Sequence, residues 1–198
     1  MRSVRRLGAA VVQRLVRPSE RTRSVQVRGL RVVVEPGVFD PVLFRSGVLL
    51  ADAVAARVQP GERVLEVGPG SGVGAIVAAR HGATVLAVDA NPAAVACTRR
   101  NADRLGVGER VQVRQGDVYR GVDGPFDRVI SNPPFYVGPP AHDPDRAWRG
   151  EGVLERLRAA PKGTKSTSAM LNRAADGLVA GGRSGIFTPL AFFVARVV

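Results

Sequence analysis

The 198-residue sequence has very few cysteine and histidine residues: one cysteine, Cys97, and two histidines, His81 and His142. A single cysteine excludes a disulfide framework within the chain, and these three residues are too few for a metal-binding cluster. Neither histidine lies near Cys97 in the sequence, so activation of the thiol as a nucleophile is not expected. Cys97 falls in a helix-like run over residues 92–101 and is predicted to fill space in the core.

Long apolar runs are also absent. No stretch reaches the roughly 18 residues that a membrane-spanning helix requires. Arg2, Arg5 and Arg6 precede an apolar stretch over residues 7–12, which is too short and too interrupted for a secretory signal. We therefore expect a cytoplasmic protein with no membrane segment.

Acidic residues are scarce in the first part of the chain. Residues 1–31 hold nine arginines and one glutamate, a net charge of +8, whereas the whole chain carries +12. Concentrated positive charge is typical of a segment that contacts nucleic acid or another polyanion. A solvated basic surface is the alternative, because no aromatic residue is interleaved with these arginines as single-strand binders require.

The length and an apolar content of 45% predict one globular domain, over residues 36–198, with a small basic segment before it. In that segment, residues 1–35, apolar side chains recur at helical spacing from Val4 to Leu15. Two β-like runs then flank Gly29. We expect a short helix followed by a β-hairpin.

The most informative stretch is residues 63–72, where a short apolar run is followed by a glycine-rich turn and a helix-like segment over residues 73–80. The turn has glycines at alternate positions, Gly68, Gly70 and Gly72. Such glycines let the backbone turn tightly and let a ligand lie against bare amides at a helix N-terminus. Glu66, at the end of the strand, is a candidate acceptor for a ligand ammonium or hydroxyl group. A plain tight turn would explain the glycines alone, and their spacing differs from the GxGxxG of dinucleotide binders.

Polar residues also follow the next three predicted strands. The strand over residues 83–88 ends at Asp89, that over 111–115 at Asp117, and that over 127–131 at Asn132. Ligands of open α/β sheets bind at this carboxyl edge. Asp89 lies 17 residues after the last glycine of the turn, where an acid typically grips ribose hydroxyls. Asp117 is a candidate acceptor for an adenine amino group.

Together, the glycine turn with Glu66, the acids Asp89 and Asp117, and Asn-Pro-Pro-Phe at residues 132–135 resemble class I S-adenosylmethionine (SAM) methyltransferases. The Asn-Pro-Pro-Phe motif is similar to that of amino-group methyltransferases. Pro-Gly-Val-Phe at residues 36–39 and Arg-Ala-Trp at residues 146–148 most resemble the HemK-type methyltransferases of release-factor glutamine. The resemblance covers roughly residues 30 to 160.

The resemblance implies an α/β fold: a Rossmann-like open, mostly parallel sheet with helices on both faces and strand order 3-2-1-4-5. A strand over residues 183–188 would be the fifth, and the chain is too short for the seven strands of the full fold, so C-terminal strands are expected to be shortened or missing. The apolar tail over residues 191–194 would lie at an open edge. Where HemK-type enzymes carry a Pro-Arg-x-x-Thr-Glu-like stretch, this chain has Asp-Pro-Val-Leu-Phe-Arg-Ser at residues 40–46.

The resemblance also implies SAM as the cofactor, without a metal. The residues expected to bind it are Glu66, Gly68, Gly70, Gly72, Asp89, Asp117 and Asn132. The expected catalytic residues are Asn132, Pro133 and Phe135. The Asn132 side-chain oxygen and the Pro133 carbonyl would accept hydrogens from a target nitrogen, and Phe135 would stack on a planar group. A proline turn after a strand is the structural alternative for this motif.

We therefore expect a SAM-dependent N-methyltransferase that acts on a planar nitrogen. The first choice of acceptor is a glutamine amide in a protein such as a release factor. The exocyclic amine of an RNA or DNA base is the second choice, and is favoured by the basic N-terminus. A SAM-fold module that binds without catalysis is a further alternative. A nicotinamide oxidoreductase is disfavoured by the glycine spacing.

Overall fold

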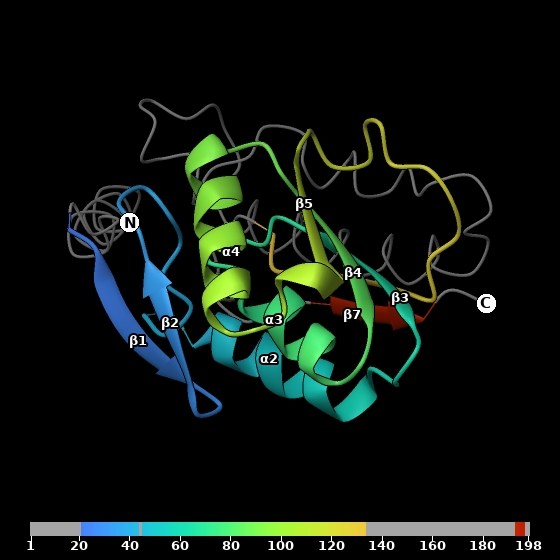
Figure 1. Ribbon diagram of the computed structural model, residues 1–198, viewed down its shortest axis with the longest axis horizontal. Coiled ribbons are helices and arrows are strands. Elements are labelled where there is room, and N and C mark those ends of the chain that lie inside the picture. The colour runs from blue at the N-terminus through green and yellow to red at the C-terminus, as the bar shows by residue number, and fades with distance from the viewer. Residues whose placement is uncertain (1–20, 44, 134–192, 197–198) are drawn as a thin grey trace, which may run out of the picture.

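The computed structural model describes residues 21–43, 45–133 and 193–196 (Figure 1). The helix expected before residue 20, Phe135, and the strand expected over residues 183–188 lie outside the described residues.

The centre of the fold is a five-stranded sheet in the order β5-β4-β3-β6-β7. Its strands are β3 (Arg63–Val67), β4 (Thr84–Asp89), β5 (Val111–Gln115), β6 (Arg128–Ser131) and β7 (Phe193–Arg196). The first four are parallel to one another, which confirms the predicted order 3-2-1-4. β7 takes the next position, pairs antiparallel with β6, and ends the described sheet.

Three helices cover one face of this sheet: α2 (Ser46–Arg57), α3 (Val73–Arg80) and α4 (Pro92–Arg104). They share a hydrophobic core with strand side chains that include Val64, Ala87 and Ile130. Leu65 and Val129 point to the opposite face of the sheet and are buried as well. Burial on both faces explains why the parallel strands read as continuous apolar runs in the sequence.

A two-stranded hairpin, β1 (Arg23–Val27) and β2 (Leu30–Val34), lies beside α4 (Figure 1). Its turn places Arg28 and Gly29 at positive φ, as a two-residue hairpin loop between right-twisted strands requires. The hairpin expected around Gly29 is therefore present, and its Val27 and Val32 side chains belong to the same core as the sheet.

The hairpin is joined to α4 by buried side chains. Asn101 accepts a hydrogen bond from the Val33 N–H (3.0 Å) and donates to the Val33 carbonyl (2.7 Å), as a neighbouring strand would. Cys97 is 1% exposed and packs with Val34, so the prediction that it fills the core is confirmed. Burial raises the pKa of its thiol, which disfavours the thiolate.

Candidate functional site

The glycine turn follows β3 at the carboxyl edge of the sheet. Gly68, Gly70 and Gly72 have φ values of 70°, 58° and 84°, in the left-handed region that other residues avoid. At Gly72 a side chain is also excluded by space, because its Cβ would lie 2.7 Å from Cγ2 of Thr98. Beside Gly68, in contrast, a Cβ would meet no atom of the described residues within 4 Å, so these residues leave room for a ligand to lie against this glycine.

Hydrogen bonds from α4 and β4 hold the turn in place. The Thr98 hydroxyl donates to the Gly70 carbonyl at 2.9 Å, and Asn101 donates to the Ser71 carbonyl at 2.9 Å. The Gly70 N–H donates to Oδ2 of Asp89 at 3.1 Å. These hydrogen bonds within the chain fix the shape of the turn, which reduces the entropy that the turn would lose on binding a ligand.

Asp89 is the last residue of β4 and lies next to the turn. Besides the bond from Gly70, its Oδ1 accepts a hydrogen bond from the Asn91 N–H at 2.9 Å. Burial raises the pKa of Asp89, and the two backbone donors partly oppose this effect. Each carboxylate oxygen has a second lone pair, so Asp89 retains acceptor capacity for two ribose hydroxyls.

The structure places Glu66 under the helix rather than at the open edge. Its side chain is 1% exposed, and Oε2 accepts a hydrogen bond from the Ala75 N–H in the first turn of α3 at 2.6 Å. A Cβ on Gly74 would clash with Oε1, so the helix lies directly on the carboxyl group. Glu66 therefore has a partner in the protein itself, which its position in the sequence did not reveal.

Burial raises the pKa of Glu66 to about 8. This raised pKa makes the stability of the fold dependent on pH. Between about pH 4.5 and 8 the folded state holds on Glu66 a proton that the unfolded state has released, so the contribution of Glu66 to stability is greatest below this window and falls as pH rises through it.

We expect Glu66 alone to lower the free energy of unfolding of the wild type by up to about 1.4 kcal/mol per pH unit across this window. Glu66→Gln keeps the acceptor for Ala75 and removes the ionisation, so its slope should be flatter. Urea unfolding at several pH values measures both slopes. The exposed Glu109→Gln is the matched control and should retain the wild-type slope. If the free energy of unfolding depends on pH equally in Glu66→Gln and in the wild type, the raised pKa of Glu66 is not the cause of this dependence.

Asn132 follows β6 at the same edge as the glycine turn. Its Nδ2 donates a hydrogen bond to Oγ of Ser46 at 3.2 Å. Its Oδ1 is buried and has no hydrogen-bond partner within the part of the chain that the structure describes. An unpaired buried carbonyl oxygen is costly, and such atoms in native proteins frequently have a functional reason. Pro133, the next residue, is buried.

Asp117 follows β5 at this edge and is exposed. The Gly116 N–H donates to the Asp89 carbonyl at 3.0 Å, which ties the ends of β5 and β4 together. The edge therefore gathers Asp117, Asp89, the glycine turn and Asn132 from four neighbouring strands, as the sequence predicted.

The segment between the hairpin and α2 also reaches this edge. The Gly37 carbonyl accepts a hydrogen bond from Asn91 Nδ2 at 3.1 Å, and Cβ of Phe39 is 3.6 Å from the Cβ position of Gly70. At the end of the segment, Ser46 contacts Asn132. Asn91 and Ser46 were not predicted from the sequence, because these contacts join residues distant in the chain. The sequence did contain one signal for the position of Asn91: an asparagine followed by a proline is typical of the start of a helix.

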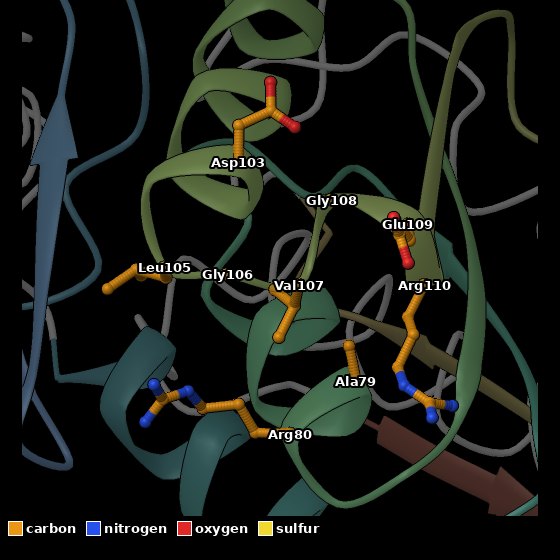
Figure 2. A pocket seen from close by; sticks show the side chains of 9 residues that line it. All are labelled: Ala79, Arg80, Asp103, Leu105, Gly106, Val107, Gly108, Glu109 and Arg110. Atoms are coloured by element: carbon orange, nitrogen blue, oxygen red, sulfur yellow. The ribbon is translucent and has the colours of Figure 1, made fainter.

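A pocket of about 810 Å³ lies elsewhere (Figure 2). It is lined by the ends of α3 and α4 and by the short 3₁₀ helix η1 (Gly108–Arg110), which precedes β5. This is the amino edge of the sheet, opposite the edge of Asp89 and Asn132. Arg80, Asp103 and Arg110 at its wall carry mixed charges, and the pocket is not part of the candidate site.

Among the described residues, no group of three or more histidine, cysteine, aspartate or glutamate side chains is arranged to hold a metal ion. In the same part of the chain, no helix combines the length and the apolar character needed to cross a membrane.

Comparison with known families gives two matches. The sequence model of the methyltransferase small domain matches residues 29–149, which contain the whole candidate site. The sequence model of the sterol methyltransferase C-terminal region matches residues 149–197, and nearly all of these residues lie outside the part of the chain that the structure describes.

Two curated relatives and one solved structure illustrate the similarity. A ribosomal protein L11 methyltransferase of Exiguobacterium is 39% identical over 103 residues, which cover 51% of this chain and 33% of the relative. A release factor glutamine methyltransferase of Gloeobacter violaceus is 37% identical over 111 residues, which cover 54% of this chain and 39% of the relative. The 16S rRNA N2 G1207 methyltransferase of Thermus thermophilus, solved with AdoMet (SAM) and guanosine, aligns with a TM-score of 0.52 at 25% identity, covering 72% of this chain and 39% of that one.

The chain thus spans 33% and 39% of the length of these two curated relatives. The likeness to the solved structure confirms the predicted Rossmann-like α/β fold.

Proposed function

The chain belongs to the methyltransferase small domain family, and from this premise we propose that it is a SAM-dependent enzyme that methylates a planar nitrogen. The observation that carries this proposal is the buried Oδ1 of Asn132, an acceptor without a partner among the described residues. It lies at the sheet edge where the glycine turn and Asp89 offer a cofactor site. A binding module without catalysis would have no need for such an acceptor.

The residues present fit the cofactor. Among the residues that the structure describes, the turn leaves open space beside Gly68 for a ligand to approach the bare backbone. Asp89 can accept from two ribose hydroxyls, and Asp117 lies at the end of the adjacent strand for the adenine amino group. SAM, when bound, supplies an activated methyl group on a sulfonium. The cation also suits an edge that carries two carboxylates.

The protein's task is then to hold the acceptor nitrogen. The lone pair of an amide or aromatic amine is delocalised, so such a nitrogen is a weak nucleophile. Oδ1 of Asn132 and the carbonyl oxygen of Pro133 would each accept one of its hydrogens and favour the positive charge that develops on it. Prolines at positions 133 and 134 restrict the backbone, which keeps these acceptors in place. Phe135 would stack on the planar group.

A glutamine amide in a protein is our first choice of acceptor. It is supported by the Asn-Pro-Pro-Phe motif and by the similarity to a release factor glutamine methyltransferase. A glutamine on a loop is accessible, whereas a base in a duplex must first be flipped out of its stack.

The test is transfer of a labelled methyl group from SAM to cell extract, followed by digestion with protease or nuclease. We expect the labelled product to become small after protease treatment and to resist nuclease. Sensitivity to nuclease would instead support a base acceptor. SAM binding without transfer to any extract fraction would support the non-catalytic module.

The exocyclic amine of an RNA base is the second candidate. Two observations favour it: the structural neighbour that was solved with guanosine, and the net charge of +8 in residues 1–31. If the basic segment recruits RNA, removing residues 1–20, which precede β1 and carry five of its nine arginines and its one glutamate, should weaken RNA binding and flatten its dependence on salt. Filter binding at several salt concentrations measures both effects. If the protein does not bind RNA, or if its RNA binding does not depend on salt, the glutamine amide remains the favoured acceptor.

A further inference from the structure

Ser46 is the partner of the proposed catalytic asparagine. It is the first residue of α2, is 0% exposed, and accepts the hydrogen bond from Nδ2 of Asn132 across 86 residues of sequence. In its current orientation the Asn132 carboxamide therefore directs its NH₂ group toward Ser46 and leaves Oδ1 without a protein partner among the described residues.

The backbone around Ser46 is held in place by its neighbours. Arg45, which precedes the helix, has φ 59°, an unusual left-handed conformation for a residue with a side chain. Its N–H donates to the Val42 carbonyl at 3.1 Å, which closes a turn before the helix. On the other side, Pro41 packs so closely on Gly47 that a side chain there would clash. The backbone of Ser46 therefore has a fixed position, from which its hydroxyl reaches Asn132.

The orientation of a carboxamide matters because its two ends are similar in shape and opposite in hydrogen bonding. With Nδ2 toward Ser46, Oδ1 can accept a hydrogen from the substrate nitrogen. If the group were rotated by half a turn, its NH₂ would face the substrate and repel the N–H groups there. A serine hydroxyl can donate as well as accept, so Ser46 holds the carboxamide in place, and the N–H groups of the substrate favour the orientation with Oδ1 toward them. We propose that Ser46 is a positioning residue that holds the Asn132 carboxamide where Oδ1 can reach the substrate nitrogen, an inference that rests on the proposed function.

The first test is kinetic. Ser46→Ala should lower the single-turnover rate of methyl transfer roughly 10- to 100-fold, as loss of a supporting hydrogen bond does at other sites, and leave SAM affinity unchanged. In the Asn132→Ala background the same substitution should change the rate by less than about twofold, because no carboxamide remains to be positioned. A purely structural serine would give effects that multiply.

The matched control is Ser131→Ala. Ser131 is also buried, at 1% exposure, and its hydroxyl donates to the Val67 carbonyl at 2.8 Å rather than to Asn132. It reports the cost of removing a buried, hydrogen-bonded hydroxyl next to the site. Its effect on the rate should be the same with asparagine or alanine at position 132.

The second test does not require activity. In an ¹⁵N-labelled protein, the side-chain NH₂ signals of Asn132 are identified by their loss in Asn132→Ala. Ser46→Ala should shift these signals and speed their exchange with water, whereas Ser131→Ala should not. The NMR experiment tests the role of Ser46 separately from the proposed function, because it can be read even if the wild type transfers no methyl group.

Signals unchanged by Ser46→Ala would overturn the positioning role, as would kinetic effects of Ser46 and Asn132 that multiply. If the wild type transfers no methyl group, the proposed function fails. The NMR result then decides alone whether Ser46 orients Asn132.

Discussion

Replacing Asn132 by alanine is expected to lower the single-turnover rate of methyl transfer about a hundred- to a thousandfold. The physical reason is that Oδ1 accepts a hydrogen from the target nitrogen, and this interaction strengthens as the nitrogen gains positive charge in the transition state. SAM affinity should change little, because the glycine turn, Asp89 and Asp117 lie on the other strand ends of the edge.

Asn132→Asp serves as the matched variant. Aspartate has nearly the same size and keeps an acceptor oxygen, so part of the activity should survive. It cannot donate to Ser46 while ionised, so some activity should also be lost. The measurement is methyl transfer at saturating SAM, with the wild type and both variants. Transfer by Asn132→Ala at the wild-type rate would show that the proposed catalytic role is wrong.

Asp89→Ala has the second largest expected effect, on SAM binding. It should weaken binding by about 1.5–3 kcal/mol, or roughly 10- to 150-fold, because charge-assisted hydrogen bonds to the ribose are lost. The structure adds a second reason, since Oδ2 of Asp89 also accepts from the Gly70 N–H and helps hold the glycine turn.

Titration calorimetry with SAM or its demethylated product measures this effect. Asp52→Ala is the control, since Asp52 is an exposed residue of α2 that pairs with Arg28 at 2.6 Å, away from the edge. It should bind SAM as the wild type does. If Asp89→Ala binds SAM as tightly as the wild type, Asp89 does not bind the ribose hydroxyls.

Local pattern was sufficient to predict the four parallel strands of this fold, and the family resemblance supplied their order in the sheet. Local pattern did not predict β7, since residues 191–194 were expected only as an apolar tail. The apolar runs over the four parallel strands, the glycines between β3 and α3, and the turn at Gly29 have strong local causes: burial on both faces, positive φ, and hairpin geometry. The alternation of strands and helices then leaves few topologies, because parallel crossovers are right-handed. For this reason the sequence pattern is enough to assign Asp89, Asp117 and Asn132 to one edge of the sheet.

The sequence by itself therefore determined the fold class and the polar residues that the strand ends bring to one edge of the sheet, where we propose that the cofactor binds. Only the tertiary structure decided what each polar group at that edge contacts. Glu66 lies beneath the first turn of α3, and Ser46 holds the amide of Asn132, because helices that pack on a sheet bring together residues far apart in the chain. A hydrogen bond forms only when the donor and the acceptor are placed to within a few tenths of an ångström, and the spacing of apolar residues in a sequence does not specify positions this finely.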